Sequence, residues 1–408
     1  MLRNRSLLTL LIAELVSTSG TAMTFLALPW FVLETTGSAS QMSAVLAAEL
    51  LPVAIFGIPS GALVGRLGAR RTMLAGDALR APLIALVPVL HWTGALTFPL
   101  LLAIVFVLGL ASAPYFAAQR TIVPELLGDD ETLVAKASAL FGGATHVTLV
   151  LGPVLGGVLV AWVGAAGVLL LDAATFAFAF FVVLLFLRGG ARVRSDDASS
   201  RGVLAGVRFL ARDPVLGPLV LTVIVLDMAG AAISVAIPLA AFVRYGEDAH
   251  IAGALFGAFG VGAVAGSVLA MKLLDRFRPL RLASGGILLA TIPLWVLAAP
   301  MPWPAAALAL FACGVFVPLV NAPAMGLITT RPPVALRAKV MTGVMTASAL
   351  GGPAGRLAVG PVYEWRGLGV MFCAVALTMS IGAILFVTVA LRADRSPVLA
   401  PPAGTPAT

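Results

Sequence analysis

The sequence predicts an all-α membrane protein in which twelve transmembrane helices form two pseudo-symmetric six-helix bundles. Hydrophobic residues make up 60% of the 408-residue chain and charged residues only 11%, whereas a soluble domain carries roughly 25% charged residues. Apolar runs of about 20 residues, long enough to cross a bilayer as a helix, follow one another along the chain. The alternating pattern of a membrane β-barrel is absent. The composition therefore excludes a cytosolic enzyme, a disordered protein and a disulfide-stapled secreted domain.

Charges and turn residues divide the apolar sequence into twelve predicted spans. The first span begins after Arg3 and Arg5. Because no small-residue cleavage site follows a short apolar core, we expect this span to be retained rather than removed as a signal peptide. The predicted spans cover residues 7–33, 40–64, 73–91, 95–119, 134–162, 165–187, 214–243, 250–272, 280–300, 304–328, 339–363 and 367–391.

A long polar segment at 188–213 separates the first six spans from the last six. Its run of serines and aspartates is followed by a predicted surface helix. We therefore predict an N-terminal bundle at 1–187, a linker at 188–213 and a C-terminal bundle at 214–395. The tail at 396–408 is rich in Pro and Ala and is expected to be disordered.

The basic residues indicate the orientation of the chain. They gather in the connections after spans two, four, six, eight, ten and twelve, while the opposite connections contain only Arg244 and Arg366. By the positive-inside rule, both termini and the basic connections face the cytoplasm, and we expect a multi-pass protein of the inner cell membrane. The excess of 26 Lys and Arg over 18 Asp and Glu is then a topology signal and does not indicate nucleic-acid binding.

Glycines spaced four apart recur on every third predicted span. This spacing lets membrane helices approach closely, so we predict that spans two, five, eight and eleven meet at the interface between the bundles. A period of three helices, repeated four times, is typical of transporters. The glycines are Gly57/Gly61/Gly65, Gly152/Gly156, Gly253/Gly257, Gly262/Gly266 and Gly351/Gly355.

Several motifs resemble those of the major facilitator superfamily, across essentially the whole chain. Residues 61–71 are similar to the loop motif between helices two and three, with Gly65 in place of the usual acidic residue, and Arg66 belongs to this motif. In the second half, Asp275-Arg276 keeps the acid–base pair, and the resemblance implies a role in gating for these loops. The core of the helix-five motif of proton-driven exporters is matched by Gly152-Pro153-Val154-Leu155-Gly156-Gly157.

Residues 119–136 and 321–341 are most similar to the macrolide-efflux and siderophore-exporter branch. The resemblance implies a monomeric secondary transporter in the lipid bilayer that exports small lipophilic or amphipathic molecules by alternating access and proton antiport. An uncoupled facilitator or a lysolipid carrier is the alternative, and a lipid enzyme or a channel is the alternative from another class. We expect no enzyme activity, cofactor or metal, since the sequence contains no phosphate-binding loop and no Cys/His cluster with ligand spacing.

Ionisable side chains inside predicted spans are costly and usually face a cavity or a partner. Glu14 and Asp227 lie on spans one and seven, which line the central cavity in the family, so they are the leading candidates for proton coupling or cation binding. His146 is a further candidate for a proton role, because histidine is the residue type that most often switches charge in proteins, and a packing role is the alternative. Asn321 lies between two prolines and predicts an irregular stretch whose carbonyls are free for a ligand, or a packing device.

The remaining charges are interpreted as structural or gating groups. Asp172 is interpreted as structural, and Asp77 and Arg80 as a local pair near the end of span three. Glu49 and Arg356 lie roughly 13 Å and 10 Å below the outer surface by helix rise. We predict that they pair across the interface and hold the outer side closed. The alternative is that Arg356 reaches a water or a carbonyl.

Overall fold

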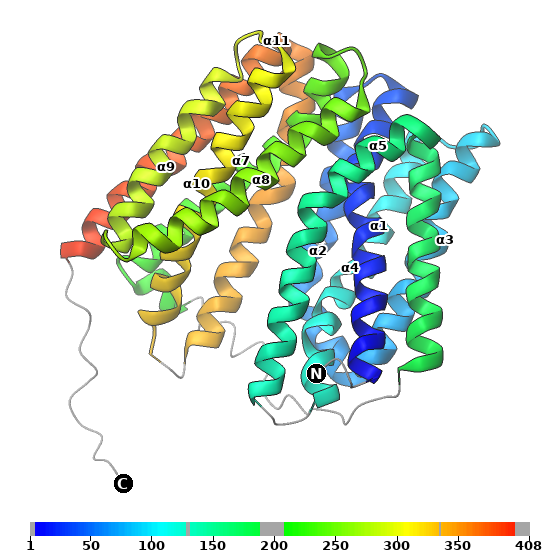
Figure 1. Ribbon diagram of the computed structural model, residues 1–408, viewed down its shortest axis with the longest axis horizontal. Helices are drawn as coiled ribbons and strands as arrows, with labels where there is room; N and C mark the ends of the chain where they lie inside the picture. The colour runs from blue at the N-terminus through cyan, green and yellow to red at the C-terminus, as the bar shows by residue number, and fades with distance from the viewer. Residues whose placement is uncertain (1–4, 128–130, 188–207, 334–335, 396–408) are drawn as a thin grey trace.

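A computed structural model describes residues 5–127, 131–187, 208–333 and 336–395. Within these ranges the regular elements are helices, and no strand is present (Figure 1). Most of the predicted linker, at 188–207, and the predicted disordered tail lie outside the described residues, and the end of the predicted surface helix is helical at 208–212.

The described chain forms ten long apolar helices that make twelve crossings of the membrane. Two of them are too long for one crossing, since α5 has 56 residues and α11 has 59, whereas about 20 residues span a bilayer. Each turns back at a glycine with positive φ, Gly164 (75°) and Gly367 (80°), a conformation that glycine adopts without steric cost. The predicted all-α fold is confirmed, and the turns fall between predicted spans five and six and between eleven and twelve. The helices are α1 Arg5–Thr36, α2 Ala39–Leu67, α3 Ala69–Trp92, α4 Phe98–Leu127, α5 Glu131–Phe186, α7 Leu216–Arg244, α8 Ala249–Leu274, α9 Pro279–Val296, α10 Trp303–Thr330 and α11 Arg337–Arg395.

The helices group into two bundles, α1–α5 and α7–α11, that lean together at one end (Figure 1). Inside the bundles, α1 packs on α5 and α2 on α4, while α7 packs on α11 and α8 on α10. Between the bundles, α2 meets α11 and α5 meets α8. These are the four helices that the glycine period places at the interface.

The spaced glycines themselves pack mostly against helices of their own bundle. The prediction therefore named the correct interface helices, but most of these glycines do not form the interface. Gly152 and Gly156 lie against α1, whereas Gly157 lies against Ala249 and Gly253 of α8. Helix α5 thus has two small-residue ridges, one facing each neighbour. Similarly, Gly262 and Gly266 face α10 and Gly351 and Gly355 face α7, while Gly57 and Gly61 border open space.

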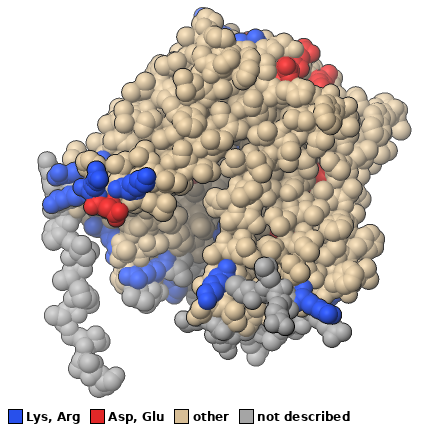
Figure 2. Space-filling model, viewed as in Figure 1, with Lys and Arg blue, Asp and Glu red and all other residues tan. Residues whose placement is uncertain are grey.

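The bundles are joined at the end far from the termini and separated at the other. One hydrophobic core crosses between them, with edge-on ring pairs Trp30–Phe242 at 5.4 Å and Phe25–Phe256 at 5.6 Å between centroids. At the opposite end, each bundle has a core of its own. Figure 2 shows a hollow between the bundles at this end, where Lys and Arg gather. We call this space the cleft, and the joined end the closed end.

Candidate functional site

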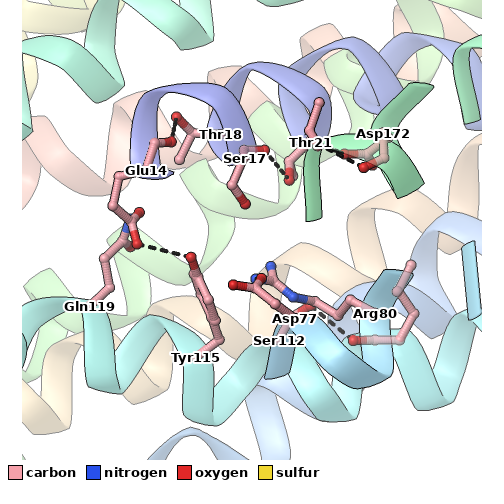
Figure 3. Close-up of polar contacts among 12 residues, drawn as sticks. Glu14, Ser17, Thr18, Thr21, Asp77, Arg80, Ser112, Tyr115, Gln119 and Asp172 are labelled. Carbon is pink, nitrogen blue, oxygen red and sulfur yellow. Dashed lines mark hydrogen bonds and ion pairs between the residues drawn. The ribbon is translucent and has the colours of Figure 1, made fainter. Parts of the chain in front are cut away.

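A buried acid, Glu14, lies inside the N-terminal bundle. It is nine residues, roughly 14 Å, from the start of α1 and only 4% exposed. Its carboxylate accepts a hydrogen bond from the Tyr115 hydroxyl at 2.9 Å and another from the Gln119 side-chain amide, both on α4 (Figure 3). The carboxylate is thus held by neutral donors.

Asp77 and Arg80 form an ion pair on α3, with 2.5 Å between Oδ1 and Nη2. The pair is predicted by its spacing, but it is enclosed by the bundle, with 0% and 3% of the two residues exposed. The guanidinium carbon lies 3.7 Å from the centroid of the Tyr115 ring and 4.3 Å from that of Phe176. Two aromatic faces therefore stabilise the buried cation in addition to Asp77.

The third buried acid of this bundle is Asp172, on the second arm of α5. It accepts hydrogen bonds from the hydroxyls of Thr24, at 2.7 Å, and Thr175, at 3.2 Å. Helix α1 approaches closely here because Gly20 has no side chain: a Cβ at Gly20 would lie 2.4 Å from Asp172 Oδ1. Gly20 and Thr24 thus form, one helical turn apart, the surface of α1 that receives this acid.

Sequence reasoning missed the partners of Glu14. Tyr115 and Gln119 are four residues apart on α4, a spacing that places them on one helical face. In an otherwise apolar run, this polar pair is a signal that could have identified them. For Asp172, the sequence indicates an intramembrane charge with a structural role but does not indicate its partner Thr24 on α1.

Asp227 lies in the other bundle, on α7, so the structure does not bring it together with Glu14. It is partly buried and accepts a hydrogen bond from the Ser348 hydroxyl of α11. Asp227 in the C-terminal bundle therefore resembles Glu14 in the N-terminal bundle, because each acid accepts a hydrogen bond from a neutral donor.

The other two candidates have less enclosed surroundings. His146 is exposed on α5, and its Nδ1 lies 2.7 Å from the Gly142 carbonyl oxygen of its own helix. Asn321 is exposed on α10. The irregular stretch predicted there is wrong, because α10 is a continuous helix over Trp303–Thr330 with both prolines inside it. A proline inside a helix lacks the amide donor and leaves the carbonyl four residues earlier without that partner, yet α10 continues past both prolines.

Glu49 and Arg356 lie together where α2 meets α11. Arg356 Nη1 is 3.6 Å from Glu49 Oε2 and also donates to the Leu46 carbonyl oxygen at 3.0 Å. The predicted pairing is therefore present, together with the carbonyl contact that was its alternative. The guanidinium also lies 5.8 Å from the Phe25 ring centroid of α1.

The same seam continues to the surface of the closed end. The Gly360 amide donates to the Ser43 hydroxyl oxygen at 2.8 Å. One turn further, the exposed Glu364 carboxylate accepts from the Ser38 hydroxyl (2.9 Å), the Ser40 amide (2.9 Å) and the Ser40 hydroxyl (2.5 Å). Because Ser38 is the N-cap of α2, an acid of one bundle lies at the positive end of a helix of the other. We call these contacts, from Glu364 to Glu49, the polar seam.

The predicted gating residues lie at the opposite end of the molecule, on α2 and directly after α8. Arg66 lies in the last turn of α2, and Asp275 and Arg276 follow α8; all three are exposed. No ion pair connects them to another residue within the described ranges. Their gating role stays a prediction.

Known proteins share both the sequence pattern and the fold of this chain. The family model described as Major Facilitator Superfamily matches residues 10–355 and 219–407. The chain belongs to the major facilitator superfamily. It is accordingly a membrane transporter and not an enzyme.

Relatives within the superfamily cover nearly all of the chain. The multidrug efflux pump Tap of Mycolicibacterium fortuitum is 29% identical over 393 residues, 91% of this chain and 93% of that protein. The pump of the same name from Mycobacterium tuberculosis is 28% identical over 417 residues, 97% and 95% of the two chains. Among solved structures, the nucleoside transporter NupG has a TM-score of 0.77 at 12% identity, covering 94% of this chain and 98% of that one. A bacterial homologue of the human lysosomal transporter Spinster, inward-facing and unoccupied, has a TM-score of 0.80 at 14% identity, covering 97% and 99%.

Proposed function

We propose that this transporter exports small lipophilic or amphipathic organic molecules across the inner membrane. The observation that carries the proposal is the likeness, along 91–97% of the chain, to relatives named multidrug efflux pumps. The positive-inside rule assigns the basic face, and with it both termini, to the cytoplasm. The cleft opens at that face, so it would receive substrate from the cytoplasm. Since the cleft lies within one chain, a monomer suffices.

Export against a gradient needs an energy source, and we propose proton antiport. The sequence holds no phosphate-binding loop for ATP. A carboxylate inside the bilayer without a cation is costly to keep ionised, so it can take up a proton and release it. Glu14, held only by neutral donors, is the proposed proton carrier. Asp227 is more exposed and lies in the other bundle, which suits it to bind the cationic group of a substrate.

The polar seam is the proposed outer gate of this cycle. Its contacts hold the closed end shut while the cleft faces the cytoplasm. To face outward, the protein would separate Arg356 from Glu49 and Glu364 from α2, and bring the basic ends of the bundles together. Arg66, Asp275 and Arg276 lie at those ends and are the proposed inner gate.

A compound screen tests the proposed function. The chain is expressed in a host whose own efflux pumps are deleted, and resistance and accumulation are measured for a panel of cationic, neutral and anionic lipophilic compounds. We expect raised resistance and lower accumulation, reversed by a protonophore, and most strongly for cations. Asp227→Asn should abolish export of the cations at unchanged expression. Accumulation equal to that of the empty host for every compound would contradict export, and export that survives the protonophore would favour the uncoupled facilitator.

A further inference from the structure

The N-terminal bundle contains more buried acids than buried cations. Glu14, Asp77 and Asp172 are each at most 4% exposed, and Arg80 is the one buried cation among the described residues of this bundle. Arg80 is bound directly to Asp77. The other two acids are held by hydroxyl and amide groups only.

Arg80 lies between these two acids. The Tyr115 ring covers one side of its guanidinium, and the hydroxyl of the same tyrosine donates to Glu14. Phe176 contacts the guanidinium as well, and Phe176 is one helical turn beyond Asp172 on the same face of α5. Figure 3 shows the Asp77–Arg80 pair between Tyr115 and Asp172. A negative charge on either Glu14 or Asp172 therefore interacts electrostatically with the same cation, Arg80.

The charges of this cluster do not balance when every acid is ionised. Three carboxylates against one guanidinium leave two negative charges in excess, and uncompensated buried charge is strongly unfavourable. Two bound protons make the cluster neutral. Asp77 has the cation as its direct partner, so the protons belong on Glu14 and Asp172. Glu49 of α2 is a further charged group that acts on Asp172, and it is paired with Arg356 of α11 at 3.6 Å.

We propose that Asp172 is a second proton-binding group, which acts with Glu14 around the shared Arg80. In each step an O–H bond of one carboxylic acid breaks and the proton passes to water. Ionisation of the first acid leaves the cluster with one excess negative charge, which disfavours ionisation of the second, so the protons leave in two separate steps. The use of these protons to drive export depends on the proposed function, but their binding does not.

Infrared spectroscopy of the purified full-length protein in detergent tests the proposal without any substrate. The absorbance of protonated carboxyl groups is followed as the pH is raised. We expect two buried acids to lose their protons in two steps. Asp172→Asn and Glu14→Gln should each leave a single step, because the two steps belong to the coupled pair, and the double variant should show none. Glu247→Gln, at an exposed acid of the other bundle, is the control and should keep both steps.

A second variant separates a proton site from a packing residue. The amide oxygen in Asp172→Asn can still accept from Thr24, so this change keeps the fold. Thr24→Val removes a donor that stabilises the ionised acid and should move one step upward by about 1 pH unit, while Thr18→Val, whose hydroxyl bonds only to its own helix, should move neither. Two unchanged steps in Asp172→Asn, or no shift in Thr24→Val, would overturn the proposal. Normal titration with no dye export by the wild type would instead contradict the proposed function alone.

Discussion

At the scale of single residues, the buried acids differ in what each one touches. Asp77 has a cation at 2.5 Å, whereas Glu14, Asp172 and Asp227 are held by hydroxyl or amide donors. The positions of these acids can be predicted from the sequence, because each interrupts an apolar run and is costly in the bilayer. Their partners cannot, because they come from other helices and depend on how those helices are rotated.

Tyr115 allows the proposed role of Glu14 to be tested at its hydrogen bond. Tyr115→Phe removes the hydroxyl that stabilises the ionised acid and leaves the ring against Arg80. Glu14 should then hold its proton to higher pH, so the midpoint of the pH profile of dye efflux should rise by about 1 unit. Tyr245→Phe, whose hydroxyl donates to the Met301 carbonyl in the other bundle, is the matched control. An unchanged midpoint would show that this hydrogen bond does not set the proton affinity.

At the scale of helices, the seams between the bundles are built from different contacts. The α2–α11 seam is polar, from Glu364 to Glu49. The α5–α8 seam depends on close backbone approach, since Gly157 lies against Gly253, and Gly253 lies against the Pro153 carbonyl oxygen. Glycine spacing predicts that a helix packs closely, but not which neighbour it packs against. For that reason the sequence indicated the four interface helices and misassigned several of the glycines.

The α5–α8 seam should tolerate no side chain at its centre. A Cβ at Gly157 would lie 2.5 Å from the Ala249 carbonyl oxygen and 2.9 Å from the Gly253 Cα, and backbone atoms cannot rotate away. Gly157→Ala should therefore destabilise this state by about 1–3 kcal/mol, measured as a lower melting temperature in detergent. Gly143→Ala on the same helix is the control, because open space surrounds that position. Equal melting temperatures would mean that the helices are not in such close contact.

The proposed outer gate depends on the coupling of Glu49 with Arg356. Glu49→Gln and Arg356→Gln should each raise the labelling of a cysteine placed in the closed end, because either change leaves one charge uncompensated. The double variant should be labelled no faster than either single variant. Additive effects in the double variant, or labelling that never changes, would show that the two residues act separately.

At the scale of the whole molecule, the positions of the hydrophobic cores define the state. One core joins the bundles at the closed end, and separate cores hold each bundle beside the cleft. The number and order of crossings follow from the sequence, because every crossing needs its own apolar run of about 20 residues. Whether the protein faces inward or outward cannot be predicted from the sequence, since the same residues must be compatible with both arrangements.

The alternation between these states should bring His146 and Val264 together. Val150 meets Gly260 across the α5–α8 seam. One turn closer to the basic end, His146 and Val264 are next in this antiparallel register, and both are exposed here. Cysteines at these two positions should crosslink poorly in the inward-facing state and readily when Glu49→Gln weakens the outer gate. Equal crosslinking with and without Glu49→Gln would contradict the proposal that the basic ends of the bundles come together when the closed end opens.

If export of substrate and import of protons are one coupled process, a substrate gradient alone should move protons. Purified protein is reconstituted into vesicles that contain a pH-sensitive dye, and a gradient of ethidium is imposed without any pH gradient. Ethidium moving down its gradient through the wild type should drive protons the opposite way and change the internal pH. Glu14→Gln should abolish this change. Ethidium flux through the wild type with no change of internal pH would contradict proton antiport.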